Sequence, residues 1–454
     1  MARLFWFRRD LRLQDHLGLN AAINGAIADG DAKVAGAYFL NISEYHSLTA
    51  IRQWSLFESL RSLNASMDAS LNVFSAERSL EETVVNAAKS IGAETVHATR
   101  AFDPAGIADQ NRVGIALKAS GIFLELTDSH YAISPGSITK ADGSPYRVYT
   151  PFYNAWMKSG WQKPVKLSTG ANWQKLAGSI SIPEPNAKAG FKVVAGEEFA
   201  LRTLMRFEKR ALNSYNELRD RADLSGTSHL SHALTFGEIH PRTILDRLGE
   251  ADGPNVFRKE IAWREFYADV LWHNPHTIDE YYDSRFAKME YNTPNDEQFA
   301  LWCQGKTGFP MVDAGMRQLL ADGWMHNRVR MIVASFLVKD LHIEWQHGAR
   351  WFEKNLSDFD PASNSHGWQW TAGSGTDASP YYRIFNPITQ GLKFDPNGDY
   401  VRKYIPELRH IAGAEVHQPW LLIDGLSQGY SSPIVDHATE RIEALARLEK
   451  IKKS

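Results

Sequence analysis

The first 128 residues alternate between short apolar runs and longer segments in which apolar residues recur with the period of a helix. The short runs predict buried parallel strands at residues 3–7, 34–40, 71–74, 95–98 and 122–126. Helical periodicity is present near residues 17–29, 49–69, 80–92 and 107–119. Five strands with interleaved helices predict a doubly wound α/β fold built on a parallel sheet.

The alternation stops after residue 129, and the pattern then changes twice. Residues 130–195 contain six of the 19 prolines and show little periodicity, which indicates a connector packed over the surface. From residue 196 to residue 454 the periodicity is almost entirely helical, and it ends with a basic amphipathic segment at 434–453. We therefore predict an α/β domain (1–129), a connector (130–195) and an all-α domain (196–454).

Composition and charge exclude several classes of protein. The chain has 454 residues, a formal net charge of −3 and a single cysteine, Cys303, so a disulfide framework, a Cys-rich zinc site and an iron–sulfur cluster are excluded. No segment has the roughly 20 apolar residues needed to cross a bilayer, and the first residues do not resemble a signal peptide. We expect a cytoplasmic, monomeric protein that makes no membrane contact.

Small hydroxyl residues precede a predicted helix at residues 226–231 (GTSHLS). The start of a helix has free backbone N–H groups, and its dipole favours an anion, so this segment suits a phosphate or diphosphate. A plain helix cap by Thr227 or Ser231 explains the same residues and is the simpler interpretation when the segment is taken alone.

Two later segments place polar and aromatic side chains on one helix face. The first face has the spacing i, i+3, i+4 and i+7 and makes either a ligand-binding wall or a solvated surface: Glu260, Trp263, Arg264 and Tyr267. The second face combines an amide, which suits a pyrimidine edge, with a cation and a soft apolar group: Asn327, Arg330 and Met331.

Residues 358–370 (DFDPASNSHGWQW) combine two carboxylates, an Asn and two Trp, which is more than turn chemistry explains. No His or third carboxylate has suitable spacing to the Asp pair, so we expect no metal site. Nine of the 14 tryptophans lie in the last 195 residues, where a large aromatic core is one explanation.

Seven segments occur in the order typical of the photolyase/cryptochrome family, which the chain resembles over essentially its whole length. They are residues 5–13 (FWFRRDLRL), 226–231 (GTSHLS), 263–267 (WREFY), 307–317 (TGFPMVDAGMR), 324–331 (WMHNRVRM), 362–370 (ASNSHGWQW) and 382–387 (YRIFNP). The resemblance is closest to the class I cyclobutane pyrimidine dimer (CPD) DNA photolyases. It implies an N-terminal antenna-binding domain and a helical C-terminal domain that holds FAD in a U shape.

The resemblance also implies which residues hold the flavin. Five residues would line the phosphates: Tyr215, Thr227, Ser228, Leu230 and Ser231. Four would hold the ribityl and isoalloxazine portions, with Arg330 paired to Asp358: Arg264, Arg330, Asp358 and Asp360. Asn364 would face flavin N5. His229 is a departure, because Arg is common at that position in the family.

The implied substrate is DNA that contains a cyclobutane pyrimidine dimer, flipped out of the stack. Six residues match the dimer-repair pattern: Glu260, Trp263, Asn327, Arg328, Met331 and Trp370. Trp263 and Trp370 would flank the dimer, and Asn327 and Glu260 would bond to its edges. The (6-4) photolyases have His at the Asn327 and Met331 positions, which disfavours their substrate. Light-excited FADH− would pass one electron to the dimer, whose ring opens before the electron returns.

Two further features follow from the same resemblance. Trp368 and Trp345 match the first two members of the family's electron-transfer chain, but the outer Trp is missing near residue 291, so we expect Tyr291 or another residue to serve as the exit. Part of an 8-hydroxy-5-deazaflavin antenna site is matched by three residues: Arg9, Arg52 and Asp103. A methenyltetrahydrofolate antenna matches less well, and an empty site is the third alternative.

Two other functions stay open as alternatives. A cryptochrome-type photoreceptor without repair activity would show a degraded lesion pocket and often a long C-terminal tail, and we expect neither. A flavin enzyme that uses NAD(P)H is disfavoured because residues 7–10 (FRRD) follow the first strand in place of a dinucleotide fingerprint.

Overall fold

The computed structural model describes residues 1–41, 45, 48–76, 79–184, 194–294, 297–377 and 382–452. Parallel strands form a sheet in the order β3-β2-β1-β4-β5. The bounds are β1 Ala2–Phe7, β2 Lys33–Leu40, β3 Asn72–Ser75, β4 Ala93–Thr99 and β5 Phe123–Thr127. All five predicted strands are present within two residues of their expected ends, so the α/β fold is confirmed.

Helices cover both faces of this sheet. One face packs against α1 (Leu17–Ala28) and α3 (Ala50–Ser66), and the other against α4 (Leu80–Ile91) and α5 (Pro104–Ala119). Successive side chains of a strand point to opposite faces. Accordingly, Leu4 and Trp6 of β1 are buried on the α4–α5 face, and Phe5 and Phe7 on the α1–α3 face. The apolar run of β1 is continuous because both of its faces are covered.

Residues 130–195 are not a uniform connector. Helix α6 (Tyr149–Ser159) buries Phe152 and Trp156 in an apolar core shared with the helical part of the chain. Strand β6 (Asn172–Trp173) then returns to the sheet and pairs in parallel with β2. The proline-rich composition hides both elements, because each is short and its burial comes from distant partners. The predicted domain boundaries therefore stay a prediction.

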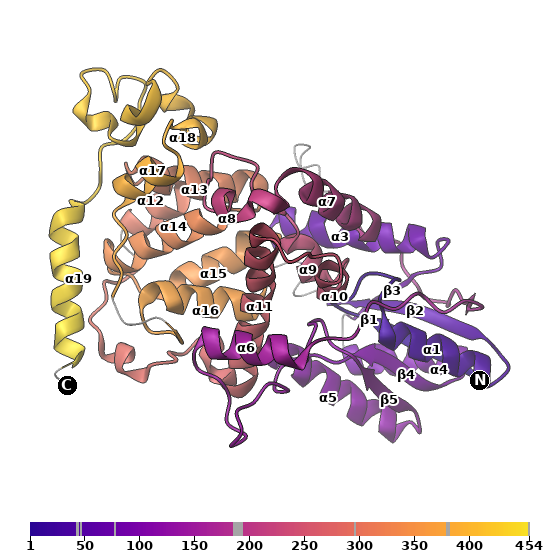
Figure 1. Ribbon diagram of the computed structural model, residues 1–454. Helices are drawn as coiled ribbons and strands as arrows, with labels where there is room; N and C mark the ends of the chain where they lie inside the picture. The colour runs from indigo at the N-terminus through magenta and orange to yellow at the C-terminus, as the bar shows by residue number, and fades with distance from the viewer. Residues whose placement is uncertain are drawn as a thin grey trace.

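The helical part follows, and Figure 1 shows α12–α19 on the opposite side of the molecule from the sheet, with α7, α9 and α10 drawn between the two. Its α-helices are α7 Glu197–Arg210, α8 Tyr215–Leu218, α9 Ser231–Phe236, α10 Pro241–Leu245, α11 Asp252–His273, α12 Glu297–Gln304, α13 Pro310–Asp322, α14 Asn327–Lys339, α15 Trp345–Asn355, α16 Pro361–Ala372, α17 Pro387–Phe394, α18 Asp399–Tyr404 and α19 His437–Lys452. The expected C-terminal helix corresponds to α19, and Lys453 lies outside the described residues.

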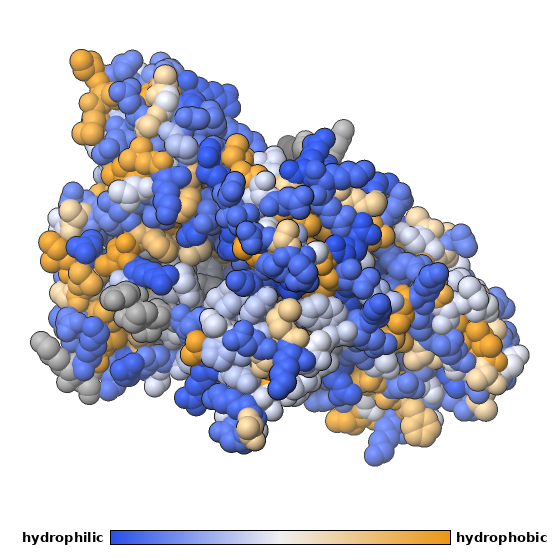
Figure 2. Space-filling model, in the orientation of Figure 1, coloured by the Kyte–Doolittle hydropathy of each residue, from blue (hydrophilic) through white to orange (hydrophobic). Residues whose placement is uncertain are grey.

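Two apolar cores hold the helical part together. One surrounds α11 and also takes in α6 and α7, and the other surrounds α13, α14 and α15. Hydrophilic side chains cover most of the face shown in Figure 2, where hydrophobic residues form separate patches. Among the described residues, no helix has the length and apolar character needed to cross a membrane.

Candidate functional site

Two cavities, of about 550 Å³ and about 530 Å³, are lined in part by α15 and α16. We call the smaller one the central cavity. It brings together all six predicted lesion-binding residues: Glu260, Trp263, Asn327, Arg328, Met331 and Trp370. It also brings together six of the predicted flavin-binding residues and one electron-transfer residue: Ser231, Arg264, Arg330, Asp358, Asp360, Asn364 and Trp368. The described residues include no group of three or more His, Cys, Asp or Glu side chains placed to hold a metal ion.

Helix α11 supplies one wall of the central cavity. Glu260, Trp263, Arg264 and Tyr267 all line it, as expected for positions that share one helix face. The Trp263 ring is stacked on Tyr149 of α6, with ring centroids 3.7 Å apart and planes 6° apart. The stack fixes the indole, which lines the cavity as a flat apolar surface.

Glu260 carries the acidic group of this wall. Arg219, which the sequence did not reveal as a site residue, donates from Nη1 to Glu260 Oε1 at 2.5 Å. Burial raises the pKa of the Glu260 carboxyl, and the nearby Arg219 cation only partly opposes that shift. A carboxyl with a raised pKa keeps its proton to a higher pH than an exposed one and can then donate a hydrogen bond.

Helix α14 supplies the opposite wall. His326 caps its N-terminus by accepting a hydrogen bond from the Arg328 N–H through Nδ1, at 3.2 Å. Asn327 and Met331 lie one turn apart, with Asn327 Nδ2 4.0 Å from the Met331 sulfur. The Arg328 guanidinium pairs with Asp220 at 2.9 Å, which holds it at the edge of the cavity.

Two carboxylates at the start of α16 each hold one arginine. Asp358 Oδ2 accepts from Arg330 Nη2 at 2.8 Å, so the pair expected from the sequence is present. Asp360 Oδ2 accepts from Arg9 Nη2 at 2.7 Å, while its Oδ1 caps α16 by accepting from the Ser363 N–H at 2.9 Å. Burial would raise the pKa of Asp360, but the nearby guanidinium groups of Arg9 and Arg264 outweigh it and hold that pKa well below its usual range.

The residues predicted for the phosphates are more scattered. Ser231 lines the central cavity and accepts a hydrogen bond from Trp324 Nε1 at 3.2 Å. Four others do not line it: Tyr215, Thr227, Ser228 and Leu230. Tyr215 is buried among aromatic rings, with its centroid 5.2 Å from that of Phe257. Leu230 occupies the N-cap of α9, so neither Thr227 nor Ser231 acts as the plain cap that the sequence suggested.

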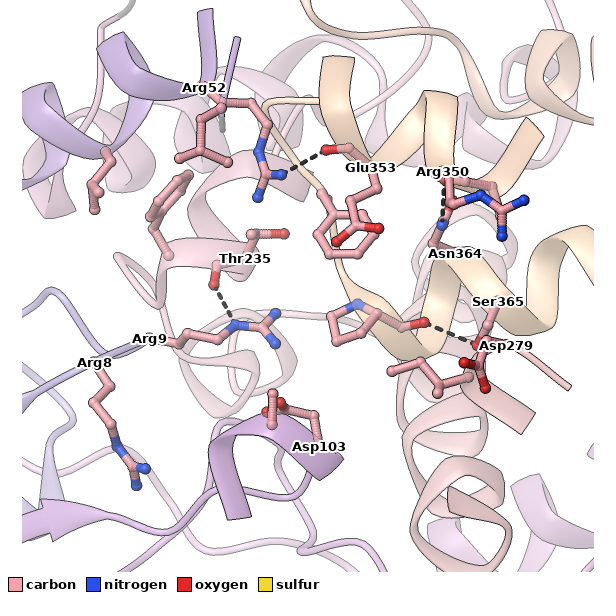
Figure 3. A pocket seen from close by; sticks show the side chains of 18 of the residues that line it. Arg8, Arg9, Arg52, Asp103, Thr235, Asp279, Arg350, Glu353, Asn364 and Ser365 are labelled. Carbon is pink, nitrogen blue, oxygen red and sulfur yellow. Dashed lines mark hydrogen bonds between the residues drawn. The ribbon is translucent and has the colours of Figure 1, made fainter. Parts of the chain in front are cut away.

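The 550 Å³ cavity, which we call the sheet-side cavity, lies between the sheet and α15 (Figure 3). All three predicted antenna residues line it: Arg9, Arg52 and Asp103. Arg52 donates to the Glu353 carbonyl oxygen at 2.6 Å, and Asp103 caps α5 through the Gly106 N–H at 2.9 Å. Thr235, Phe359 and Asn364 line both cavities and therefore form the wall between them.

Two of the predicted electron-transfer residues line the cavities, Trp368 the central one and Trp345 the sheet-side one. Trp368 of α16 is 3% exposed and Trp345 of α15 is 0% exposed. The Trp368 ring packs against the backbone at Gly348, where a Cβ atom would collide with it. Gly348 lies three residues after Trp345, so both indoles lie along one side of α15. Tyr291 is partly buried, and its ring lies against Tyr281.

Comparison with known proteins identifies the family. A family model described as DNA photolyase matches residues 3–168, and one described as FAD binding domain of DNA photolyase matches residues 257–450. The deoxyribodipyrimidine photo-lyase of Alkalihalophilus pseudofirmus is 37% identical over 97% of this chain and 96% of its own. That of Agrobacterium fabrum is 38% identical, over 99% and 98%. The chain belongs to the DNA photolyase family. The match to the FAD-binding domain covers α14, α16 and most of α11, which line the central cavity.

Solved photolyase-family structures share the whole fold. A bacterial class III photolyase from Agrobacterium tumefaciens has a TM-score of 0.89 at 37% identity and covers 100% of this chain and 98% of its own. An archaeal photolyase from Sulfolobus tokodaii, solved with two FAD molecules, has a TM-score of 0.86 at 26% identity, over 99% and 100%. A Synechocystis cryptochrome has 0.85 at 27%, over 98% of each chain. The family and the two-part fold are confirmed, whereas closeness to class I stays a prediction.

Proposed function

We propose that this protein is a deoxyribodipyrimidine photo-lyase that uses light to split cyclobutane pyrimidine dimers in DNA. The observation that carries the proposal is the central cavity, which combines all six lesion-type residues with the flavin-type residues in one space. The alternative, a photoreceptor without repair activity, would not require the lesion-type residues. The names of the full-length relatives agree with the proposed enzyme class.

The residues of the central cavity fit FAD. Arg264 and Arg330 supply cations, and Asp358 presents a buried Oδ1 atom that has no hydrogen-bond partner among the described residues. Buried polar atoms normally have partners, so this oxygen is suited to a ligand donor. Asn364 adds an amide between the two cavities. The volume lies within the range of known cofactor pockets. When bound in its reduced form, FAD supplies one electron after it absorbs light.

The protein's part is to bind and orient the dimer. Trp263 and Trp370 present aromatic faces that replace the stacking a flipped-out base loses. Asn327 offers both a donor and an acceptor to a pyrimidine edge. The raised pKa of Glu260 favours its protonated form relative to an exposed carboxyl, and in that form it can donate to a pyrimidine carbonyl oxygen and stabilise negative charge there. Arg328 lines the cavity and supplies a cation that suits a DNA phosphate.

A direct experiment tests the repair function. The chemically reduced protein is mixed with oligothymidylate that contains thymine dimers, and the ultraviolet absorbance of thymine is followed under blue light. We expect a rise that stops when the light is removed. No rise, with flavin bound and dimer-containing DNA bound in the dark, would favour the photoreceptor function.

We further propose that Trp368 and Trp345 carry electrons to the flavin when it is oxidised. Trp368→Phe should abolish rapid photoreduction after a laser flash. Trp302→Phe is the matched control, because Trp302 is equally buried and its ring centroid lies 6.2 Å from that of Trp368. Rapid photoreduction in the Trp368 variant would contradict the assignment.

The sheet-side cavity is our proposed antenna site. Its guanidinium groups of Arg9 and Arg52 suit an anionic chromophore such as 8-hydroxy-5-deazaflavin. The absorption spectrum of protein reconstituted separately with deazaflavin and with methenyltetrahydrofolate distinguishes the candidates. A bound chromophore should shift its band, and Arg52→Ala should reduce that binding.

A further inference from the structure

Beyond Trp345, a pair of tyrosine rings extends the line of aromatic side chains. The Tyr281 ring centroid lies 6.2 Å from that of Trp345, with the planes at 79°. The Tyr291 ring is stacked on Tyr281, with centroids 6.5 Å and planes 12° apart. Tyr281 is 8% exposed and lies between the 3-10 helices Pro275–Ile278 and Ser284–Lys288. The outer tryptophan that the sequence lacks near residue 291 is thus replaced in space by two phenols.

The Tyr281 hydroxyl already has a proton acceptor. It donates to Glu344 Oε1 at 2.8 Å, and Glu344 is the residue immediately before Trp345. Burial, together with Tyr291 and Glu344, raises the pKa of Tyr281, so the phenol keeps its proton at neutral pH. A phenol that loses an electron becomes a strong acid, and a carboxylate at hydrogen-bond distance can take the proton as the electron leaves.

We infer that Tyr281 is the electron donor to oxidised Trp345, with Glu344 as its proton acceptor and Tyr291 as the next donor outward. The inference rests on the proposed electron path through Trp368 and Trp345. The oxidant is the light-excited, oxidised flavin of that path, which gains the electron. Tyr281 loses one electron and its hydroxyl proton, Trp345 returns to its neutral form, and Glu344 becomes a carboxylic acid.

The other aromatic branch from Trp368 does not offer this chemistry. Trp302 contacts Trp368, but its Nε1 donates to the Val333 carbonyl oxygen at 3.1 Å, and a backbone carbonyl does not take a proton. At the Tyr291 end, Arg447 of α19 donates to the Glu290 carbonyl oxygen at 2.9 Å and to Asn292 Oδ1. The proposed electron path therefore runs from Trp368 of α16 and Trp345 of α15 toward α19.

Electron paramagnetic resonance tests the first donor. The flavin-loaded protein carries ring-deuterated tyrosine and is frozen during illumination, so a tyrosyl radical is recognised by its narrowed spectrum. We expect this signal in the wild-type protein and in Tyr291→Phe, and its loss in Tyr281→Phe. The matched control is Tyr404→Phe, because the Tyr404 hydroxyl also donates to a carboxylate, Asp322 Oδ2 at 2.6 Å. A tyrosyl signal that persists in Tyr281→Phe, or is lost in Tyr404→Phe, would overturn the inference.

A second variant tests the proton acceptor. Glu344→Gln keeps a hydrogen-bond acceptor beside Tyr281 but removes the basic carboxylate. We expect radical formation in the wild type to slow in deuterated water, and Glu344→Gln to lose most of the radical yield. Equal yield with an unchanged isotope effect would exclude Glu344. Dimer repair by chemically reduced wild-type protein is measured in parallel. Its absence would refute the proposed function and not the electron transfer from Tyr281 to Trp345.

Discussion

At the scale of single residues, the charged side chains of the central cavity are each held by a second structural element. Asp360 caps α16 and pairs with Arg9, two residues after β1, so one carboxylate fixes two parts of the chain. Asp358 pairs with Arg330 of α14. Glu260 pairs with Arg219. Groups held in this way are in position before a ligand binds, which reduces the ordering cost of binding.

The stacked pair of Trp263 and Tyr149 gives a prediction at this scale. Trp263→Ala removes the aromatic surface, and base–aromatic stacking contributes about 1–3 kcal/mol, or roughly fivefold to 150-fold in affinity. We expect that loss in the dark dissociation constant for dimer-containing oligothymidylate. Affinity for undamaged DNA is the control and should stay the same. An equal loss for both DNAs would show that Trp263 does not contact the lesion.

At the scale of elements, the contact between α15 and α16 depends on one glycine. A Cβ atom at Gly348 would collide with the Trp368 ring and with Leu337. The collision in Gly348→Ala should therefore lower the free energy of unfolding by about 1–3 kcal/mol. The higher helix propensity of alanine offsets roughly 1 kcal/mol of that loss. Gly367→Ala in α16 meets no atom within 4 Å and should instead be stabilising. Urea denaturation of the two variants checks both signs.

The anchoring of the chain after β5 to α11 gives a pH-dependent prediction. Glu265 accepts hydrogen bonds from Trp156 Nε1 at 2.5 Å and from the Ile133 N–H at 3.2 Å, and burial raises the pKa of its carboxyl from 4.5 to about 7. Between those two values the folded protein binds the proton more tightly than the unfolded chain. Stability therefore falls as the pH rises through this window, by roughly 3 kcal/mol.

Glu265→Gln keeps the shape of the side chain and removes its titration. The difference in free energy of unfolding between wild type and variant should change across this pH window and be constant on either side of it. Chemical denaturation at a series of pH values measures this difference. A constant difference from low to neutral pH would mean that the buried carboxyl has an ordinary pKa.

At the scale of the whole molecule, buried ion pairs join the sheet to the helical part. Arg242 of α10 is 2% exposed and pairs with Asp15 at 3.1 Å and with Asp128 at 2.7 Å. Arg242→Ala leaves two carboxylates without their cation and should cost about 3–5 kcal/mol. Arg247, whose side chain is 42% exposed beside Glu208, is the matched control, and its removal should cost at most about 1 kcal/mol. Thermal unfolding of both variants tests the difference.

How much of this the sequence predicted depends on the distance between partners along the chain. The period of a helix was enough to place Glu260, Trp263 and Arg264 on one wall, and continuous apolar runs were enough to find the sheet. Arg219 and Tyr149 were missed, because their contacts with α11 join segments far apart in sequence and exist only after packing. No local periodicity records such contacts.

The wall shared by the two cavities has a consequence for how the protein can evolve or be engineered. Thr235, Phe359 and Asn364 each face both spaces, so a substitution there changes the lining of both cavities at once. If both cavities hold a chromophore as proposed, selection on one chromophore is thereby constrained by the other. One cavity can be changed without the other only by substituting residues that line a single cavity, such as Arg52 in the sheet-side cavity and Met331 in the central cavity.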